Sequence, residues 1–361
     1  MVLYLKKLLL LFVCSCAYLS AQTIELKNKE LISYYDLINK AEIDIVNNNL
    51  PDANAMYTQA FNVLKEPQGK DIYNALQVAL KIGDKGNAYS RYHILKCLRY
   101  PFDKNYISEH FKNEKLPKIQ CSNVIDQPYR KTLDSLLSID QKYRLLSNGN
   151  YKKYQKEITQ NDSIASVSLL KLIQKKGFPN EYTIGIEDKS DLVLQNFHFI
   201  IWHQLATNNL SSQKVNFSEE LNKALNVGKI TPQCAAFLYD LNNGSDSFSS
   251  MHFNILEFLT PNGSKEPFHD QVQNKTAKSE CCFIHEWFFP EKRSEQGNAM
   301  VTKINESRRQ IGLSDLDSEL LKLKFTLSNN EYIFGNIGFK KEALENIKQV
   351  EYLKKHLIKL Q

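Results

Sequence analysis

Apolar residues recur every three or four positions over the first third of the chain, and this spacing constrains the fold more than any other feature. It extends from Lys29 to about Asn113, and it is clearest at Leu31, Ile32, Tyr35 and Ile38 and then at Met56, Tyr57, Ala60, Phe61 and Leu64. Pro51 suits the first turn of the second helix, and Pro67-Gln68-Gly69 ends it. The sequence therefore predicts a run of amphipathic helices here.

Within this region a set of residues recurs at an offset of 34 or 35 positions. The first copy consists of Ala41, Asn48, Ala53, Tyr57 and Ala60, and the second consists of Ala75, Gly83, Ala88, Tyr92 and Leu95. The spacing resembles that of tetratricopeptide helical hairpins, in which small residues let two helices approach closely. The resemblance implies that Tyr57 and Tyr92 fill the groove toward the next repeat, where they are candidate binding residues. A generic antiparallel helix bundle is the alternative.

The rest of the chain predicts a second helical unit. The helical pattern lapses from Ile119 to Gln127 between two prolines, and it resumes at Pro128. The stretch from Leu192 to Leu205 is strongly apolar, and we expect it to be a buried central helix. After Asn242-Asn243-Gly244 two aromatic-rich runs, 253–259 and 282–289, predict a small hairpin with a long loop. Residues 301–310 and 340–360 again have helical periodicity.

These patterns together predict a mainly α fold in five parts. Residues 1–21 form a signal peptide and 22–117 the tetratricopeptide-like region. Residues 118–127 form a linker, 128–325 a helical domain with a small β-hairpin or irregular insert, and 326–361 a C-terminal helical extension.

The first 21 residues predict export. Lys6-Lys7 precede an unbroken apolar run from Leu8 to Val13, and small residues follow, as in secretory signal peptides. Two processing routes fit: cleavage after Ala21, which releases the protein, or lipidation of Cys16 in a relaxed bacterial lipobox. We expect a periplasmic, envelope-bound or secreted protein with no membrane-spanning helix after cleavage.

Net charge argues against nucleic acid as a partner. The chain has 46 Lys and Arg against 40 Asp and Glu, a formal charge of +6. Removal of Lys6 and Lys7 leaves 44 minus 40, or +4, spread over about 340 residues, which is weak and diffuse.

Five cysteines remain after cleavage, so at least one of them has no partner within the chain. They are Cys97, Cys121, Cys234, Cys281 and Cys282. Cys97 and Cys121 are close enough in sequence for a disulfide, although both also fit as small buried residues. No second pair at ligand spacing accompanies Cys281-Cys282, and we predict no metal or cofactor.

Five common enzyme motifs are missing: the chain has no HExxH, P-loop, GxSxG, GxGxxG or paired CxxC. His203 stands where the apolar run turns polar, so it is a candidate general acid or base at a pocket mouth. The alternative is a buried histidine held by a hydrogen bond. Arg308 and Arg309 suit either anion binding or the C-terminal end of a helix dipole.

Residues from 169 to 313 resemble an uncharacterised domain family of bacterial secreted proteins, a domain of unknown function. The residues that carry the resemblance are Leu169 to Ile173, Gly177-Phe178-Pro179, Gly185, His203, Gly228, Ala235, Tyr239-Asp240, Ile304 and Arg308 to Leu313. The match covers about 128–325. Members of the family share a helix-borne histidine, an Asp-Arg pair and an Arg-Arg-x-x-Gly-Leu segment, which correspond here to His203, Asp240 and Arg308 to Leu313. The resemblance implies a fold and no reaction. Two departures are Leu241, where the family has Arg, and Ser249 to Asn254, where it has Gln-x-Tyr-Gly.

A second cluster with chemical potential is the run from His285 to Pro290. Exposed aromatic residues beside a histidine and a glutamate bind carbohydrate or peptide, whereas a strand packed on the core is the simpler interpretation.

Two classes of function are compatible with the sequence. The first is an interaction protein of the cell envelope or exterior, whose helical repeats hold a protein or peptide partner. The second is a hydrolase-like enzyme built around His203, Asp240 and Arg308, with Arg309 as a binding residue. The second requires these side chains to converge in one pocket.

Overall fold

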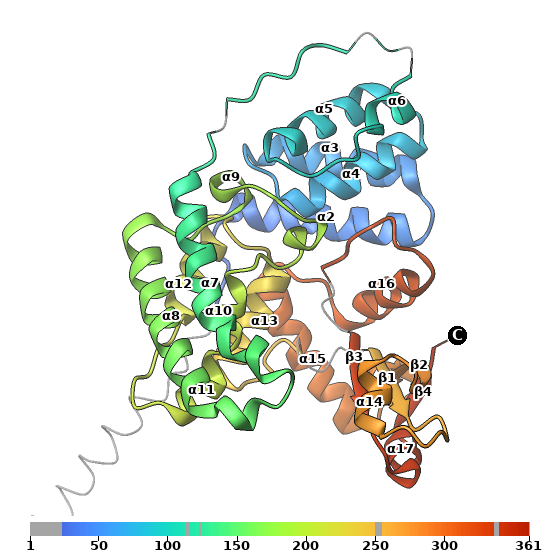
Figure 1. The fold of residues 1–361 in the computed structure, drawn as a ribbon. Helices are drawn as coiled ribbons and strands as arrows, with labels where there is room; N and C mark the ends of the chain where they lie inside the picture. The colour runs from blue at the N-terminus through green and yellow to red at the C-terminus, as the bar shows by residue number, and fades with distance from the viewer. Residues whose placement is uncertain are drawn as a thin grey trace, which may run out of the picture.

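The computed structural model describes residues 24–360, except 113, 115, 123, 250–254 and 336–338. The predicted signal peptide and Cys16 lie outside these residues. The described part contains sixteen α-helices and a four-stranded sheet, which confirms a mainly α fold with a small β element (Figure 1). None of its helices combines the length and the hydropathy needed to cross a membrane.

The N-terminal helices form consecutive packed pairs. They are α2 (Lys29–Val46), α3 (Leu50–Val63), α4 (Gly69–Lys81), α5 (Lys85–Cys97) and the short α6 (Tyr106–His110). α2 packs on α3, α4 packs on α5, and α3 contacts α4. The repeated small and aromatic positions are buried between these helices. Asn48 and Gly83, which correspond in the two copies, follow α2 and α4 with positive φ angles of 61° and 77°, so each ends its helix at a tight turn.

The next helices belong to the second unit of the chain. They are α7 (Gln127–Ser147), α8 (Gln155–Lys176), α9 (Glu181–Ile184), α10 (His198–Trp202), α11 (Gln204–Leu210), α12 (Ser218–Asn226) and α13 (Pro232–Asn243). Short 3-10 turns are η1 (Tyr151–Tyr154), η2 (Lys189–Leu192), η3 (Glu286–Phe288) and η4 (Pro290–Lys292). α13 begins at a capped turn, because Thr231 Oγ1 accepts from Cys234 N and Pro232 occupies the first helical position.

The prediction of one continuous central helix over 192–205 is wrong. The apolar stretch forms η2, a loop and two short helices, α10 and α11, with the break at His203. Apolar content requires only that this stretch be buried, and it does not require one continuous helix.

One hydrophobic core joins the two predicted units. Leu31 and Tyr57 of the N-terminal helices belong to the same buried cluster as Leu133, Leu169 and Phe217. The described residues between α6 and α7 form no helix or strand, and two of them, Leu116 and Ile119, pack against the N-terminal helices. The linker at 118–127 therefore does not separate two cores.

The sheet has the order β3-β1-β2-β4. Its strands are β1 (Ile255–Thr260), β2 (Lys278–His285), β3 (Phe339–Ala343) and β4 (Leu357–Lys359). β1 and β2 are antiparallel, with Leu256 opposite Phe283, so the predicted hairpin is confirmed; its long loop carries α14 (Phe268–Gln273).

The predicted C-terminal helix over 340–360 is wrong. Only α17 (Ile347–Lys354) is helical there, and strands flank it. β3 pairs in parallel with β1, and β4 pairs with β2. The helical period of these residues is a local signal, and hydrogen bonds to strands distant in sequence outweigh it.

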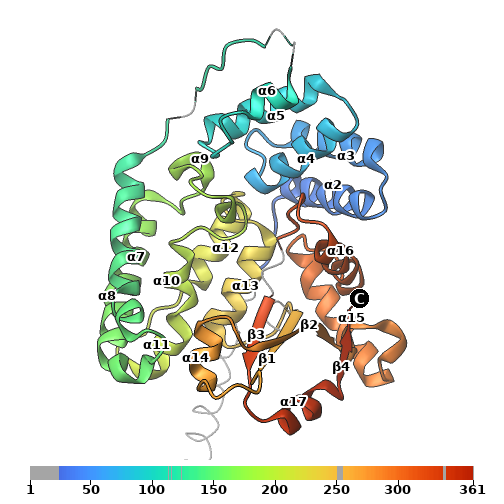
Figure 2. The same ribbon diagram turned by 45° about the vertical axis from the view of Figure 1, so that its right-hand side comes forward.

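Helices cover both faces of the sheet (Figure 2). On one face Ile255 and Ile284 pack with residues of α15 (Glu295–Gln310) and α16 (Leu316–Ser328). On the other face Phe258 and Phe283 pack with Val350 of α17. This second core has only three fully buried members among the described residues, so α17 is held by a small apolar contact.

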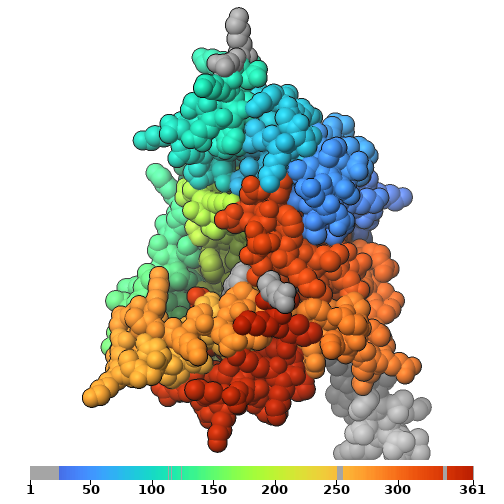
Figure 3. Space-filling model, turned by 90° about the vertical axis from the view of Figure 1, so that its right-hand side faces the viewer, coloured from blue at the N-terminus to red at the C-terminus, as the bar shows by residue number. Residues whose placement is uncertain are grey.

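The segment between α16 and β3 links the sheet to the N-terminal helices. Ile333 N donates to Asn74 Oδ1 at 2.8 Å, and Asn74 Nδ2 donates to Ile333 O at 2.7 Å. Figure 3 shows this orange-red segment lying against the blue helices.

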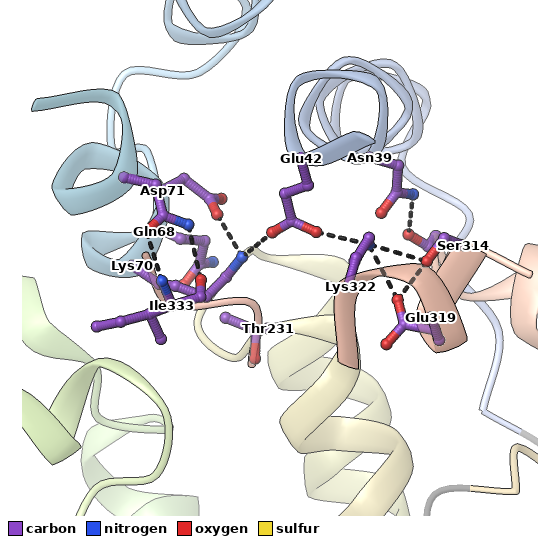
Figure 4. Close-up of polar contacts among 12 residues, drawn as sticks. Asn39, Glu42, Gln68, Lys70, Asp71, Thr231, Ser314, Glu319, Lys322 and Ile333 are labelled. Atoms are coloured by element: carbon purple, nitrogen blue, oxygen red, sulfur yellow. Dashed lines mark hydrogen bonds and ion pairs between the residues drawn. The ribbon is translucent and has the colours of Figure 1, made fainter. Parts of the chain in front are cut away.

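A buried ionic network ties α2, α4 and α16 together (Figure 4). Lys322 Nζ lies 2.6 Å from Glu42 Oε2 and 2.9 Å from Glu319 Oε1. Lys70 bonds the other oxygen of Glu42 and lies 2.8 Å from Asp71 Oδ1. These five side chains, which we call the closed network, are at most 8% exposed.

Candidate functional site

His203 lies at the break between α10 and α11 and faces a carboxylate on α7. Its Nδ1 is 2.9 Å from Asp140 Oδ2 and 3.0 Å from Asp140 Oδ1. The Asp140 side chain is fully buried, whereas that of His203 is 20% exposed. The predicted histidine is therefore paired with a carboxylate and remains partly open to solvent.

Arg144 and Asp162 extend this pair. Arg144 Nη1 and Nη2 lie 2.6 Å and 2.7 Å from the two oxygens of Asp162, and Nη1 lies 3.5 Å from Asp140 Oδ2. Thr207 Oγ1 donates to Asp162 Oδ2 at 2.9 Å. Burial raises the pKa of the Asp162 carboxyl, and the Arg144 guanidinium only partly opposes this effect. We call Asp140, Arg144, Asp162, His203 and Thr207 the His203 cluster.

Two hollows border the His203 cluster. The larger, of about 550 Å³, is lined by Leu137, Gln141, Arg144, Tyr151, Asn196, Phe199 and His203. The second, of about 240 Å³, lies between η1, α8 and α11 and shares Arg144 and Tyr151 with the first. A side chain that is paired at one nitrogen and open to a hollow is suited to proton transfer.

Three members of the cluster have the donor types of a metal site. One ligand atom each from Asp140, Asp162 and His203 lies within 4.8 Å of the others. Arg144, however, already supplies the cation that faces Asp162, so an incoming ion would have to displace a bidentate guanidinium. The donor set therefore fits a metal ion poorly.

The structure pairs His203 with Asp140 and not with the expected Asp240. Asp240 is fully buried, and it accepts hydrogen bonds from Ser245 Oγ, Ser247 N and Phe248 N at 2.8–3.1 Å. It therefore holds the turn that follows α13. The predicted convergence with His203 is wrong.

Arg308 supports the same turn. Its Nη1 donates to Phe248 O at 2.9 Å, and its Nε donates to Ser314 O at 2.7 Å. Burial lowers the pKa of Arg308, and Glu319 opposes this effect. Arg309 is exposed on the last turn of α15. Neither arginine has a contact with His203 in the structure, so the predicted anion site is not assembled there.

The two repeat tyrosines are core residues, which corrects their assignment to a binding groove. Tyr57 is fully buried, and its ring lies 5.9 Å from that of Phe61. Tyr92 is 5% exposed and stacks on Tyr106. Their large apolar rings fill space between helices, and no partner can reach them in this conformation.

The cysteines are divided between two disulfides and one buried thiol. Cys97 and Cys121 are bonded, with their Cα atoms 5.3 Å apart, which ties the end of α5 to the irregular connector. The adjacent Cys281 and Cys282 are also bonded to each other. Cys234 is a buried free cysteine, and burial raises the pKa of its thiol.

A hollow of about 730 Å³ lies beside the sheet. It is lined by residues of β1, β3, β4, α15 and α17 and by His285 and Trp287. Its rim includes Met300, Tyr352 and Leu353, which are between 40% and 64% exposed. We call it the sheet cavity.

The run His285 to Pro290 divides between the two roles expected for it. Phe288 and Phe289 are buried in the core beside the sheet, although Phe288 also borders the cavity. His285 lies across the cavity wall from His356, with ring centroids 6.3 Å apart, and His356 Nδ1 is 3.0 Å from Glu286 Oε1.

Asp140 and Asp162 were not among the residues predicted from sequence. Both, however, interrupt the apolar faces of their helices, because Asp140 follows Leu136 by four positions and Asp162 precedes Leu169 by seven. A carboxylate on a buried face is costly unless it has a partner, so this pattern was the available signal.

Comparison of the chain with models of protein families, with curated proteins and with solved structures gives no match. The resemblance of residues 128–325 to a secreted-domain family therefore rests on its sequence motifs alone. The geometry of the His203 cluster and of the sheet cavity is the basis for assigning a function.

Proposed function

We propose that this protein is exported and binds a protein or peptide partner, and that the sheet cavity receives an apolar side chain of that partner. The supporting observation is the 730 Å³ hollow with an exposed apolar rim. Cavities of this size with mostly apolar walls and few polar groups are typical of ligand sites. The partner class is the one expected from the sequence, but the site differs because Tyr57 and Tyr92 are buried.

The walls of the sheet cavity favour a large apolar or aromatic side chain. Leu256 and Phe258 of β1 and Leu357 of β4 supply apolar surface. Lys340, Glu342 and Gln349 also line it, and they offer both donors and acceptors to the main chain of a bound peptide. A side chain that fills this volume would also complete the small core beneath α17.

The proposed location rests on the first 21 residues. Release after Ala21 and lipidation at Cys16 both place the mature protein outside the cytoplasm, in the periplasm, on the envelope or in the medium. A disulfide between Cys97 and Cys121 agrees with an oxidising compartment.

The test is selection of random 12-residue peptides displayed on phage against the purified mature protein. We expect the selected peptides to share a large apolar residue and to lose binding at least about tenfold to Leu353→Glu, which puts a charge on the cavity rim. Leu145→Glu is the matched control, because Leu145 is 77% exposed on α7 and does not line the cavity. Failure to select any peptide, or equal binding to both variants, would overturn the proposal.

A further inference from the structure

We propose that His203 is a general base that activates water for the hydrolysis of uncharged carboxylic esters, with Asp140 as its positioning residue. The inference is independent of partner binding at the sheet cavity. It rests on the His203–Asp140 contact and on the hollow of about 550 Å³ that His203 borders.

The contact determines which nitrogen of His203 can act. Asp140 accepts from Gln141 Nε2 at 2.7 Å and lies 3.5 Å from Arg144 Nη1, so donors surround it and it is a carboxylate. A carboxylate accepts, and Nδ1 of His203 therefore carries the proton. The opposite nitrogen, Nε2, then has a lone pair and is the base.

The neighbouring histidine shows why His203 is the one that can react. His198 is fully buried, its Nδ1 accepts from Gln195 N at 3.2 Å, and burial lowers its pKa to about 3. Its Nδ1 also lies 3.5 Å from the buried thiol of Cys234, and its ring packs against Phe178 and Phe197. His203, in contrast, lines an open hollow.

The charges around the hollow exclude an anionic substrate. The guanidinium of Arg144 is bonded to Asp162 through both terminal nitrogens, so it is not free to bind a phosphate or a carboxylate. The carboxylates of Asp140 and Asp162 outnumber the one guanidinium beside them, so their combined field disfavours an anion. The substrate that fits is uncharged.

The uncharged walls of the hollow indicate the rest of the substrate. Leu137, Tyr151 and Phe199 supply apolar surface, and Asn196 supplies a carboxamide. None of the described residues that line the hollow is Asp or Glu, so no carboxylic acid is placed to protonate a poor leaving group, and an ester suits the site better than an amide. Short acyl esters of aromatic alcohols match these walls.

The reaction consumes one water. The water oxygen forms a bond to the ester carbonyl carbon while Nε2 of His203 takes one water proton. The carbonyl oxygen becomes an oxyanion, for which the carboxamide of Asn196 on the same hollow offers a donor. The intermediate then breaks its bond to the alcohol oxygen. The imidazolium returns the proton to that oxygen, which leaves a carboxylic acid and an alcohol.

The test uses p-nitrophenyl acetate and p-nitrophenyl butyrate with the purified mature protein. We expect His203→Gln to lower kcat/KM by at least about 100-fold, while His269→Gln, at an exposed histidine of α14, leaves it unchanged. Asp140→Asn should lower kcat/KM by at least about tenfold and shift the acid limb of the pH profile, which a purely structural residue would not do. Circular dichroism checks that each variant is folded.

Three outcomes would overturn the inference. The first is hydrolysis no faster than with free imidazole at the same concentration. The second is full activity of His203→Gln. The third is loss of activity on dialysis against EDTA, which would instead assign Asp140, Asp162 and His203 to a metal ion.

Discussion

The closed network and the His203 cluster are built from similar charged groups but differ in their access to solvent. In the closed network Glu42, Asp71 and Lys322 are at most 1% exposed, and each charge faces another protein group (Figure 4). In the His203 cluster the side chains of His203 and Arg144 are 20% and 14% exposed, and both line hollows.

This difference separates a structural role from a chemical one. A sealed ion pair has no room for a substrate, and it holds distant helices in one arrangement. A cluster with one open side keeps a reactive atom in contact with solvent while its partners hold that atom in place. The residue types alone therefore do not distinguish the two roles.

The largest expected effect is on the closed network. Lys322→Met removes the cation between Glu42 and Glu319 and leaves two buried carboxylates without it, so we expect a loss of about 3–5 kcal/mol in the free energy of unfolding. Urea denaturation followed by circular dichroism measures this loss. Lys324→Met, at an exposed position of the same helix, should cost no more than about 1 kcal/mol. A loss below about 1 kcal/mol for Lys322→Met would contradict the structural role.

Arg144→Met should have a smaller effect on stability. It leaves Asp162 without its bidentate partner, but water can enter through the adjoining hollows, so we expect a loss of about 1–3 kcal/mol. The same urea titration compares it with Lys322→Met. If Arg144→Met cost as much as Lys322→Met, the His203 cluster would behave as a sealed network.

Glu319 of the closed network and Asp162 of the His203 cluster should respond to acid with opposite signs. Burial alone would raise the pKa of Glu319, but the cations of Lys322 and Arg308 outweigh burial, so the pKa of Glu319 is lowered. The pKa of Asp162 is raised by its burial. A carboxyl whose pKa is lower in the folded than in the unfolded protein stabilises the fold above its unfolded pKa, and this stabilisation is lost as pH falls through its folded pKa. A carboxyl whose pKa is higher in the folded protein has the opposite effect, so stability rises as pH falls.

Unfolding free energies at several pH values between 7 and about 3.5 test these signs, since unfolded carboxyls titrate near ~4. As pH falls, the advantage of the wild type over Glu319→Gln should shrink, and its advantage over Asp162→Asn should grow. Slopes of the same sign for both variants would refute the contrast.

The smallest expected stability change is that of His203→Gln. Glutamine can still donate to Asp140, and the side chain is partly exposed, so the unfolding free energy should change by no more than about 0.5 kcal/mol. Thermal melts of wild type and variant measure it. A large loss here would make His203 a structural residue and would weaken any argument from its loss of activity.

Local patterns explain what could be predicted. The apolar spacing of α2 to α5, the Thr231-Pro232 start of α13 and the hairpin of β1 and β2 all depend on residues near one another in sequence. The prediction of a C-terminal helix over 340–360 was wrong because residues 339–343 pair with β1, about 80 positions earlier. Helical period cannot detect such pairing.

The site residues show the same division. His203 was recognisable because it ends an apolar run, whereas Asp240 and Arg308 carry motif signals yet hold a turn at Phe248. The true partner of His203 is Asp140, 63 positions away on α7. Nothing in the spacing of the two residues indicated this contact.

The sequence by itself determined the helical class, the buried faces of most helices and the presence of His203 at a polar boundary. Each of these depends only on the order of side chains that are neighbours in the chain. Only the tertiary structure decided which carboxylate meets His203, which lysine lies between Glu42 and Glu319, and where the sheet leaves a cavity. Those outcomes depend on how elements far apart in the chain are placed in space, and a charge or a hollow acquires its role from what is packed around it.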